Sequence, residues 1–241
     1  MVSSRKTLLI LSFALFGVIS LQAQRAISDQ RVEAVLSRFE KHSNLIDSLA
    51  CVFDQDAIPV LAVVGPEWVR YSMVRDLMET SALEFAYVRF GPEAADFSIG
   101  PFQMKPSFIE ALEAAIGEAE DFPLHIQFTV AYATSNPVLQ RKVRLQRMKE
   151  IRWQYYYAFA FYILSQDRFR DHFSTKSTNP VAFIASAYNF GFTRPVAAIE
   201  SWQHEEVFPY GNSFLGKQES YAQVSLRFYE ALQARFGKIW Q

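Results

Sequence analysis

Apolar residues recur along this chain at the spacing of helices. In residues 28–42, Val32, Val35, Leu36 and Phe39 stand at i, i+3, i+4 and i+7, on one face of a helix that Ser28 or Asp29 could cap. Similar patterns, bounded by Gly, Pro and Asn, predict helices in residues 66–88, 107–116, 137–173, 180–190, 195–202 and 220–236. The pattern therefore predicts an all-α protein.

Two strongly apolar stretches indicate what lies at the centre. Residues 153–164 (WQYYYAFAFYIL) are apolar nearly all round, which is typical of a buried helix. Residues 58–64 (IPVLAVV) are compatible with a strand or with a buried helical turn. Gly65-Pro66 follows at once, and Pro66 suits the first turn of a new helix that runs on past Glu79.

The most irregular part of the chain is residues 91–106, a loop rich in Gly and Pro. It ends in Ser107-Phe108-Ile109-Glu110, which has the form of a capping box. In that motif the Ser hydroxyl accepts from the N3 amide and the Glu side chain reaches back to the cap. We therefore expect a structured loop, followed by a helix that ends at Gly117.

Charge adds a second kind of information. Residues 141–152 hold six basic side chains, for which we expect a solvated helix face with the long stems covering apolar surface. The alternative is a patch that steers an anionic polymer. The whole chain has 24 basic and 25 acidic residues, a formal net charge of −1, so no nucleic-acid partner is expected.

The first 24 residues read as a secretory signal peptide. Arg5 and Lys6 form a positive region, residues 7–21 are apolar, and Leu21-Gln22-Ala23 is a loose cleavage site. The alternative is a retained anchor helix, although the apolar run is short for a membrane span. We expect an exported protein of the periplasm or cell envelope. Its mature part, residues 25–241, would be one domain without a membrane span after cleavage.

The remaining chemistry-bearing residues exclude some classes of site. Cys51 is the only cysteine, so no intramolecular disulfide can form, and its apolar neighbours predict a small buried side chain. The four histidines are scattered, without the spacing of zinc ligands. We expect no metal and no cofactor.

Three short segments, taken together and in order, carry a resemblance. They are Glu79-Thr80 in a helix, residues 98–104 (SIGPFQM) in a loop before a helix, and residues 187–191 (AYNFG) at a helix end. The pattern resembles the lysozyme-like lytic transglycosylases and goose-type lysozymes, which have Glu-Ser, Gly-Leu-Met-Gln and Ala-Tyr-Asn-Ala-Gly at corresponding places. The likeness covers about residues 60–200.

The resemblance implies a lysozyme-like helical domain whose cleft holds a peptidoglycan glycan strand. It implies that Glu79 is the catalytic acid, which must be protonated near neutral pH to protonate the leaving oxygen. Here Thr80 replaces the family Ser. Glu79 lies 24 positions before Gln103, longer than the common transglycosylase spacing, whereas Glu84 lies 19 positions before it. Glu84 is therefore the rival candidate.

The same likeness assigns substrate-binding residues. Ser98 and Gln103 correspond to polar positions that hold the Glu or the sugar, and Gly100 would let the backbone approach the ligand. Tyr188 corresponds to a tyrosine whose hydroxyl lies near the catalytic carboxyl, and Asn189 can bond sugar or backbone. The alternative for residues 188–191 is an ordinary helix C-cap with a packed aromatic side chain.

The expected activity is non-hydrolytic cleavage between MurNAc and GlcNAc, which gives 1,6-anhydro ends with a single Glu as acid and base. One alternative is an inverting, goose-type-like muramidase, in which Asp96 positions a water. The other is a non-catalytic cell-wall-binding protein of the same fold. In each case the expected partner is the peptidoglycan glycan strand, bound by a monomer.

Overall fold

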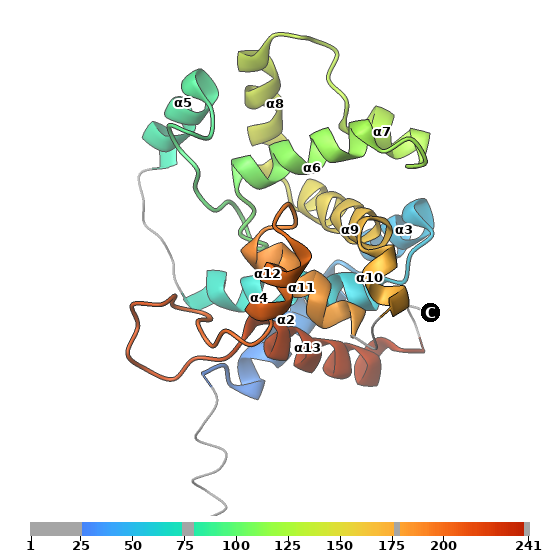
Figure 1. The fold of residues 1–241 in the computed structure, drawn as a ribbon, viewed down its shortest axis with the longest axis vertical. Coiled ribbons are helices and arrows are strands. Elements are labelled where there is room, and N and C mark those ends of the chain that lie inside the picture. Colours follow the sequence, from blue (N-terminus) through green and yellow to red (C-terminus); the bar gives the residue numbers. More distant parts are fainter. Residues whose placement is uncertain (1–25, 74–79, 176–178, 239–241) are drawn as a thin grey trace, which may run out of the picture.

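The computed structural model describes residues 26–73, 80–175 and 179–238 (Figure 1). Its helices are α2 (Asp29–Lys41), α3 (Ser43–Phe53), α4 (Ala57–Met73), α5 (Thr80–Phe90), α6 (Pro106–Glu118), α7 (Leu124–Val130), α8 (Pro137–Lys149), α9 (Ile151–Arg168), α10 (Arg170–Thr175), α11 (Pro180–Phe190), α12 (Val196–Trp202) and α13 (Tyr221–Phe236). Within the described ranges, β pairing is limited to isolated bridges at Ile99–Met104 and Phe208–Glu219. The prediction of an all-α protein is confirmed.

Helix α4 is the centre of the fold. It packs against α2, α3, α9, α11 and α13, and every residue from Ala57 to Val69 is buried. The helix is continuous through Pro66, so the expected break at Gly65-Pro66 is wrong, and so is the strand alternative for residues 58–64. Pro66 has no backbone N–H, so one helical hydrogen bond is missing in this part of α4. Near the missing bond, the hydroxyl of Tyr221 donates to the Val63 carbonyl at 2.9 Å.

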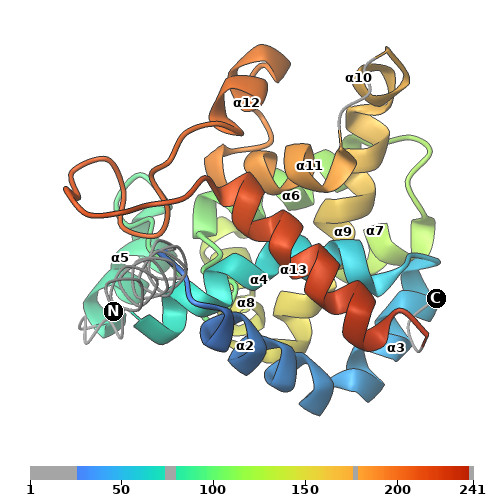
Figure 2. The same cartoon turned by 90° about the horizontal axis from the view of Figure 1, so that it is seen from below.

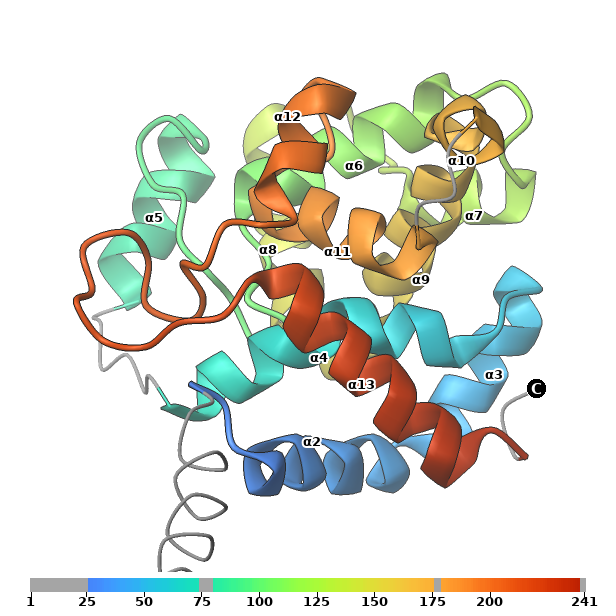
Figure 3. The ribbon, with the colours of Figure 1, turned by 60° about the horizontal axis from the view of Figure 1, so that its bottom comes forward.

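Helix α13 crosses α4 at close range, as Figures 2 and 3 both show. A Cβ on Gly65 would lie only 2.8 Å from the ring of Phe228. The glycine therefore serves the crossing of two helices, because a larger side chain there would push the ring away. This contact fixes the turn of α4 that precedes Glu67.

Helix α9 carries the second part of the core. The buried helix predicted for residues 153–164 is confirmed, since Tyr155, Tyr157, Phe159 and Phe161 have no exposed surface. Its neighbours include α6 and α8, which lie in the upper part of Figure 1, and α3, α4 and α11, which lie lower. Helix α9 therefore connects these two groups of helices.

The solvated basic face expected for residues 141–152 is found only in part, because Lys142, Lys149 and Arg152 are exposed but Arg144 is not. Arg144 is buried and donates to Glu113 at 2.7 Å, to Glu110 at 2.8 Å and to the Tyr87 hydroxyl at 3.0 Å. Tyr157 of α9 also donates to Glu113, at 2.6 Å. These bonds join α5, α6, α8 and α9 through one buried ion pair and its hydroxyl partners.

The helix starts follow the sequence in part. Asn136 and Asn179 cap α8 and α11 through their side chains, as the Asn-Pro pairs predict. The capping box at Ser107 does not form, because α6 begins one residue earlier, at Pro106. Ser107 bonds to Asp96 instead, and Glu110 bonds to Arg144.

Three other predictions have different outcomes. Cys51 is exposed, so the expectation of a buried thiol is wrong. No helix in the described ranges is both long enough and apolar enough to cross a membrane. The proposed signal peptide, residues 1–24, and the predicted acid Glu79 lie outside the described residues.

Candidate functional site

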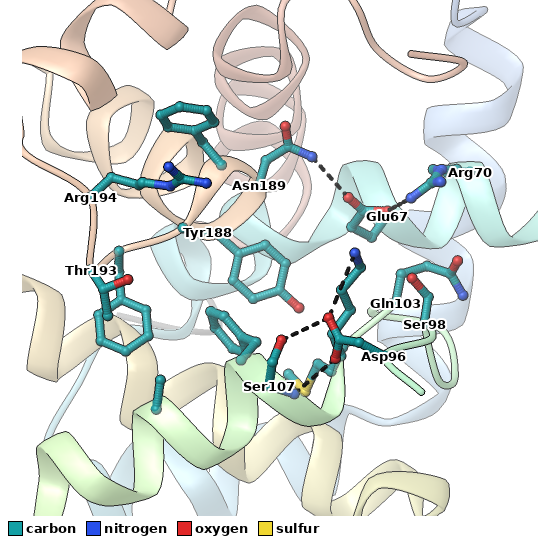
Figure 4. Close-up of a pocket in the computed structure, with 17 residues that line it drawn as sticks. Glu67, Arg70, Asp96, Ser98, Gln103, Ser107, Tyr188, Asn189, Thr193 and Arg194 are labelled. Carbon is teal, nitrogen blue, oxygen red and sulfur yellow. Dashed lines mark hydrogen bonds and ion pairs between the residues drawn. The ribbon is translucent and has the colours of Figure 1, made fainter. Parts of the chain in front are cut away.

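A pocket of about 550 Å³ opens between α4 and the start of α6 (Figure 4). One wall is Glu67 and Arg70 of α4, and the facing wall comes from residues 96–105 and the start of α6. The end of α11 and residues 191–194 close a third side. Segments far apart in the sequence thus meet at one cavity.

Glu67 is the buried carboxylate of this pocket. It is 4% exposed, and its oxygens lie 3.2 Å from the Asn189 side-chain nitrogen and 3.4 Å from the Arg70 guanidinium. Burial raises the pKa of the Glu67 carboxyl, and this effect outweighs the opposing effects of Arg70 and Asn189. A carboxyl of this kind retains its proton to a higher pH than an exposed Glu does.

The orientation of the Asn189 amide is set by a third residue. The indole nitrogen of Trp202 donates to Asn189 Oδ1 at 3.0 Å, so the amide nitrogen faces Glu67. Trp202 is itself held by stacking on Phe190, with ring centroids 4.3 Å apart. Glu67 therefore has a hydrogen-bond donor whose direction does not depend on a ligand.

The loop between α5 and α6 turns tightly at residues 99–104. Ile99 and Met104 exchange both backbone bonds, at 2.8 and 3.2 Å. Gly100 and Gln103 have positive φ values of 67° and 50°. The side chain of Gln103 donates to the Gly100 carbonyl at 2.9 Å, which ties the two positive-φ residues together.

Side chains from two other helices hold the backbone of this loop. Gln154 of α9 is fully buried, accepts from Phe102 N at 2.9 Å and donates to the Ile99 carbonyl at 2.9 Å. Tyr188 donates its hydroxyl to the Phe102 carbonyl at 2.7 Å. Burial, and then the nearby charge of Glu67, raises the pKa of Tyr188 well above its ordinary value, so the hydroxyl keeps its proton.

Asp96 has a structural partner on each oxygen. It accepts from the Ser107 backbone nitrogen at 2.9 Å and from the Ser107 hydroxyl at 2.8 Å, and Lys105 lies 3.9 Å away. Asp96 thus takes the place that the capping box would have had at the start of α6, where a negative charge is also favoured by the helix dipole.

Most of the predicted substrate-binding residues meet in the pocket. Its lining includes Asp96, Ser98, Gln103, Tyr188 and Asn189. Gly100 is not in the lining. A Cβ there would lie 1.7 Å from Gln154 Nε2, so the absence of a side chain leaves room for the Gln154 amide that holds the loop.

Of the two candidates that the sequence offered for the acid, the structure describes only Glu84. Glu84 lies on α5, pairs with Lys149 at 2.6 Å and is not in the pocket lining.

Glu67 was not among the candidates, because Gly65-Pro66 suggested a helix start, where an acidic residue needs no special explanation. The available signal was that Glu67 is the one charged side chain between Asp56 and Arg70, in a stretch otherwise suited to the core.

The described residues include no group of three or more His, Cys, Asp or Glu side chains placed to hold a metal ion. No family model, curated protein or solved structure matches this chain. Function must therefore be argued from the pocket itself.

Proposed function

We propose that the protein is a peptidoglycan lytic transglycosylase and that Glu67 is its single acid and base. The supporting observation is a buried carboxyl with a raised pKa, in a polar pocket with Ser98, Gln103, Tyr188 and Asn189. This arrangement keeps the resemblance noted in the loop and in residues 187–191, and it moves the catalytic role from Glu79 to Glu67.

The chemistry requires one group that first gives and then takes a proton. Glu67, protonated because its charged form is poorly solvated, would donate to the glycosidic oxygen as the bond to the muramic C1 breaks. The resulting carboxylate would then accept the proton of the sugar's own 6-hydroxyl as that oxygen bonds to C1. Proton and leaving group balance without a second catalytic carboxylate. The Asn189 amide, fixed by Trp202, would stabilise the carboxylate between the two steps.

The state of Asp96 favours this reaction over hydrolysis. An inverting enzyme needs a second carboxylate that is free to activate water. Both oxygens of Asp96 are engaged by Ser107. An internal 6-hydroxyl has a high effective concentration and does not need that base.

The test is a comparison of carboxyl-to-amide variants on purified sacculi. Glu67→Gln should lower the rate of release of soluble muropeptides by about 10²–10⁴, the range for loss of an essential proton donor. Glu84→Gln, which changes a carboxyl outside the pocket, is the matched control and should remain active. Loss of activity in Glu79→Gln or Glu84→Gln, with a fully active Glu67→Gln, would return the role to the earlier candidates.

Product masses separate the remaining alternatives. Anhydro ends, lighter than reducing ends by one water, support the transglycosylase, and Asp96→Asn should then release them too once its folding is verified. Reducing ends that disappear in a folded Asp96→Asn variant would indicate the inverting muramidase. If the wild-type protein binds sacculi without releasing product, the protein is the non-catalytic binder.

A further inference from the structure

The segment after α11 carries a cation that lines the pocket and has no acidic partner among the described residues. Arg194 lines the pocket and is exposed. Among the described residues, no carboxylate lies within 4.0 Å of its guanidinium, whereas Arg70 and Lys105, also in the lining, lie within that distance of Glu67 and Asp96. Figure 4 shows Arg194 on the opposite side of the pocket from Arg70.

Aromatic stacking and a glycine turn position this arginine. Its guanidinium carbon lies 5.1 Å from the centroid of the Phe190 ring, a cation–π contact. Phe190 is stacked on Trp202, the residue that also orients Asn189. Gly191, with φ of 122°, makes the turn between them, and the Arg194 nitrogen bonds back to the Gly191 carbonyl at 3.2 Å.

Contacts therefore run without a gap from the Arg194 cation to the Glu67 carboxyl, through Phe190, Trp202 and Asn189. Arg presents several N–H donors in one plane, which suits a carboxylate acceptor. A guanidinium already placed over a ring loses less freedom when it binds than a mobile side chain does.

We propose that Arg194 is a subsite for a carboxylate of the ligand and makes the protein prefer glycan strands that carry acidic stem peptides. This rests on the proposed function, because it takes the ligand to be peptidoglycan. The sugars of such a strand have no free charge apart from the muramic side arm, which the peptide caps. The acidic groups that could reach Arg194 are then those of the peptide, attached close to the sugar that Glu67 would cleave.

The experiment measures affinity for two preparations of the same strands, one with the carboxylates of its stem peptides free and one with those carboxylates converted to amides, so that the muramic side arm stays capped in both. Binding is measured by sedimentation in the Glu67→Gln background, so that strands stay intact. The affinity ratio is the affinity for strands with charged stem peptides divided by the affinity for strands with amidated ones. Replacing Arg194 with Gln should lower this ratio by about tenfold or more, the scale of one hydrogen bond to a charged group. Arg194→Lys, which keeps the charge and loses the planar donors, should give an intermediate ratio. The ratio should also fall toward one as salt is raised.

Arg168 provides the matched control. It is also exposed, lies over the ring of the adjacent Phe169 at 5.9 Å, and lies on α9 outside the pocket lining. Arg168→Gln should leave the ratio as it is in the parent. Thermal midpoints of all variants verify folding.

An unchanged ratio in a folded Arg194→Gln variant would overturn the proposal. So would an equal loss of affinity for both preparations, because Arg194 would then contact the sugar or hold Phe190. The affinity ratio is measured without cleavage, so it is independent of catalysis. If wild-type protein releases no product from either preparation, the transglycosylase proposal fails, and the affinity ratio still decides the role of Arg194.

Discussion

Replacing Gly100 with Ala tests how the pocket loop is held. The new Cβ would lie 1.7 Å from Nε2 and 2.6 Å from Cδ of Gln154, so the buried amide must move. The backbone would also have to keep a φ of 67°, which costs a residue with a Cβ about 1–2 kcal/mol. Gln154 bonds to Phe102 N, to the Ile99 carbonyl and to the Met148 carbonyl.

The magnitude follows from these contacts. Each buried group left without a partner costs about 1–3 kcal/mol. Loss of even one of the three bonds, added to the backbone cost, gives a destabilisation of roughly 2–5 kcal/mol. That is a large part of the ~5–15 kcal/mol that stabilises an ordinary domain. Urea denaturation followed by circular dichroism should show the loss directly.

Two further variants make the test specific. Gly117→Ala is the matched control, because that glycine lies in α6 with no atom within 4 Å of its Cβ position, and its stability should be unchanged or raised by up to ~1 kcal/mol. In a Gln154→Ala background, Gly100→Ala should cost only the backbone contribution of about 1–2 kcal/mol. Equal costs in both backgrounds, or a Gly100→Ala protein as stable as wild type, would refute the argument.

Three other predictions concern charge and packing. Because burial raises the pKa of Glu67, the folded state binds this proton more tightly than the unfolded state does; stability from this group should fall as pH rises from about 4.3, the ordinary Glu value, through the raised pKa. Urea midpoints across pH should show that fall in wild type and its loss in Glu67→Gln. Glu113→Gln leaves Arg144 buried with a weakened partner and should cost about 3–5 kcal/mol in urea denaturation. Gly65→Ala places a Cβ 2.8 Å from the Phe228 ring and should cost about 1–3 kcal/mol, measured as a lower thermal midpoint.

The sequence was most informative where one local signal decides the outcome. The 3.6-residue period predicted α2 with its buried face, and Asn-Pro pairs predicted the starts of α8 and α11. The apolar run of residues 153–164 predicted the buried helix α9. Such features depend on neighbours in the chain, so they can be read before the fold is known.

The failures share another cause, which is that the deciding partner is distant in sequence. Ser107 has a good local partner in Glu110, but Glu110 is taken by Arg144, and Asp96 supplies the bond that Ser107 makes. Pro66 looks like a helix start, yet tertiary packing of α4 keeps the helix intact through it.

The site was predicted in the same uneven way. Residues 98–104 and 187–191 were recognised because each motif lies within a few positions of the sequence, and side chains from both segments line the pocket. The sequence marks Glu67 only as a lone charge in an apolar stretch. Its hydrogen-bond partner Asn189, and Trp202 which orients that partner, lie more than 100 positions away along the chain, so its place in the pocket comes from the three-dimensional structure.

The continuity of α4 through Pro66 has a consequence for motion. Protein segments open locally with very different free energies, and the least stable ones supply the movements that accompany binding. Glu67 lies on a helix whose residues 57–69 are all buried and which five other helices surround. We therefore expect its amide protons to exchange with solvent only when the whole domain unfolds. On that expectation the Glu67 carboxyl stays in place when a ligand binds, and the pocket closes by movement of the walls opposite it.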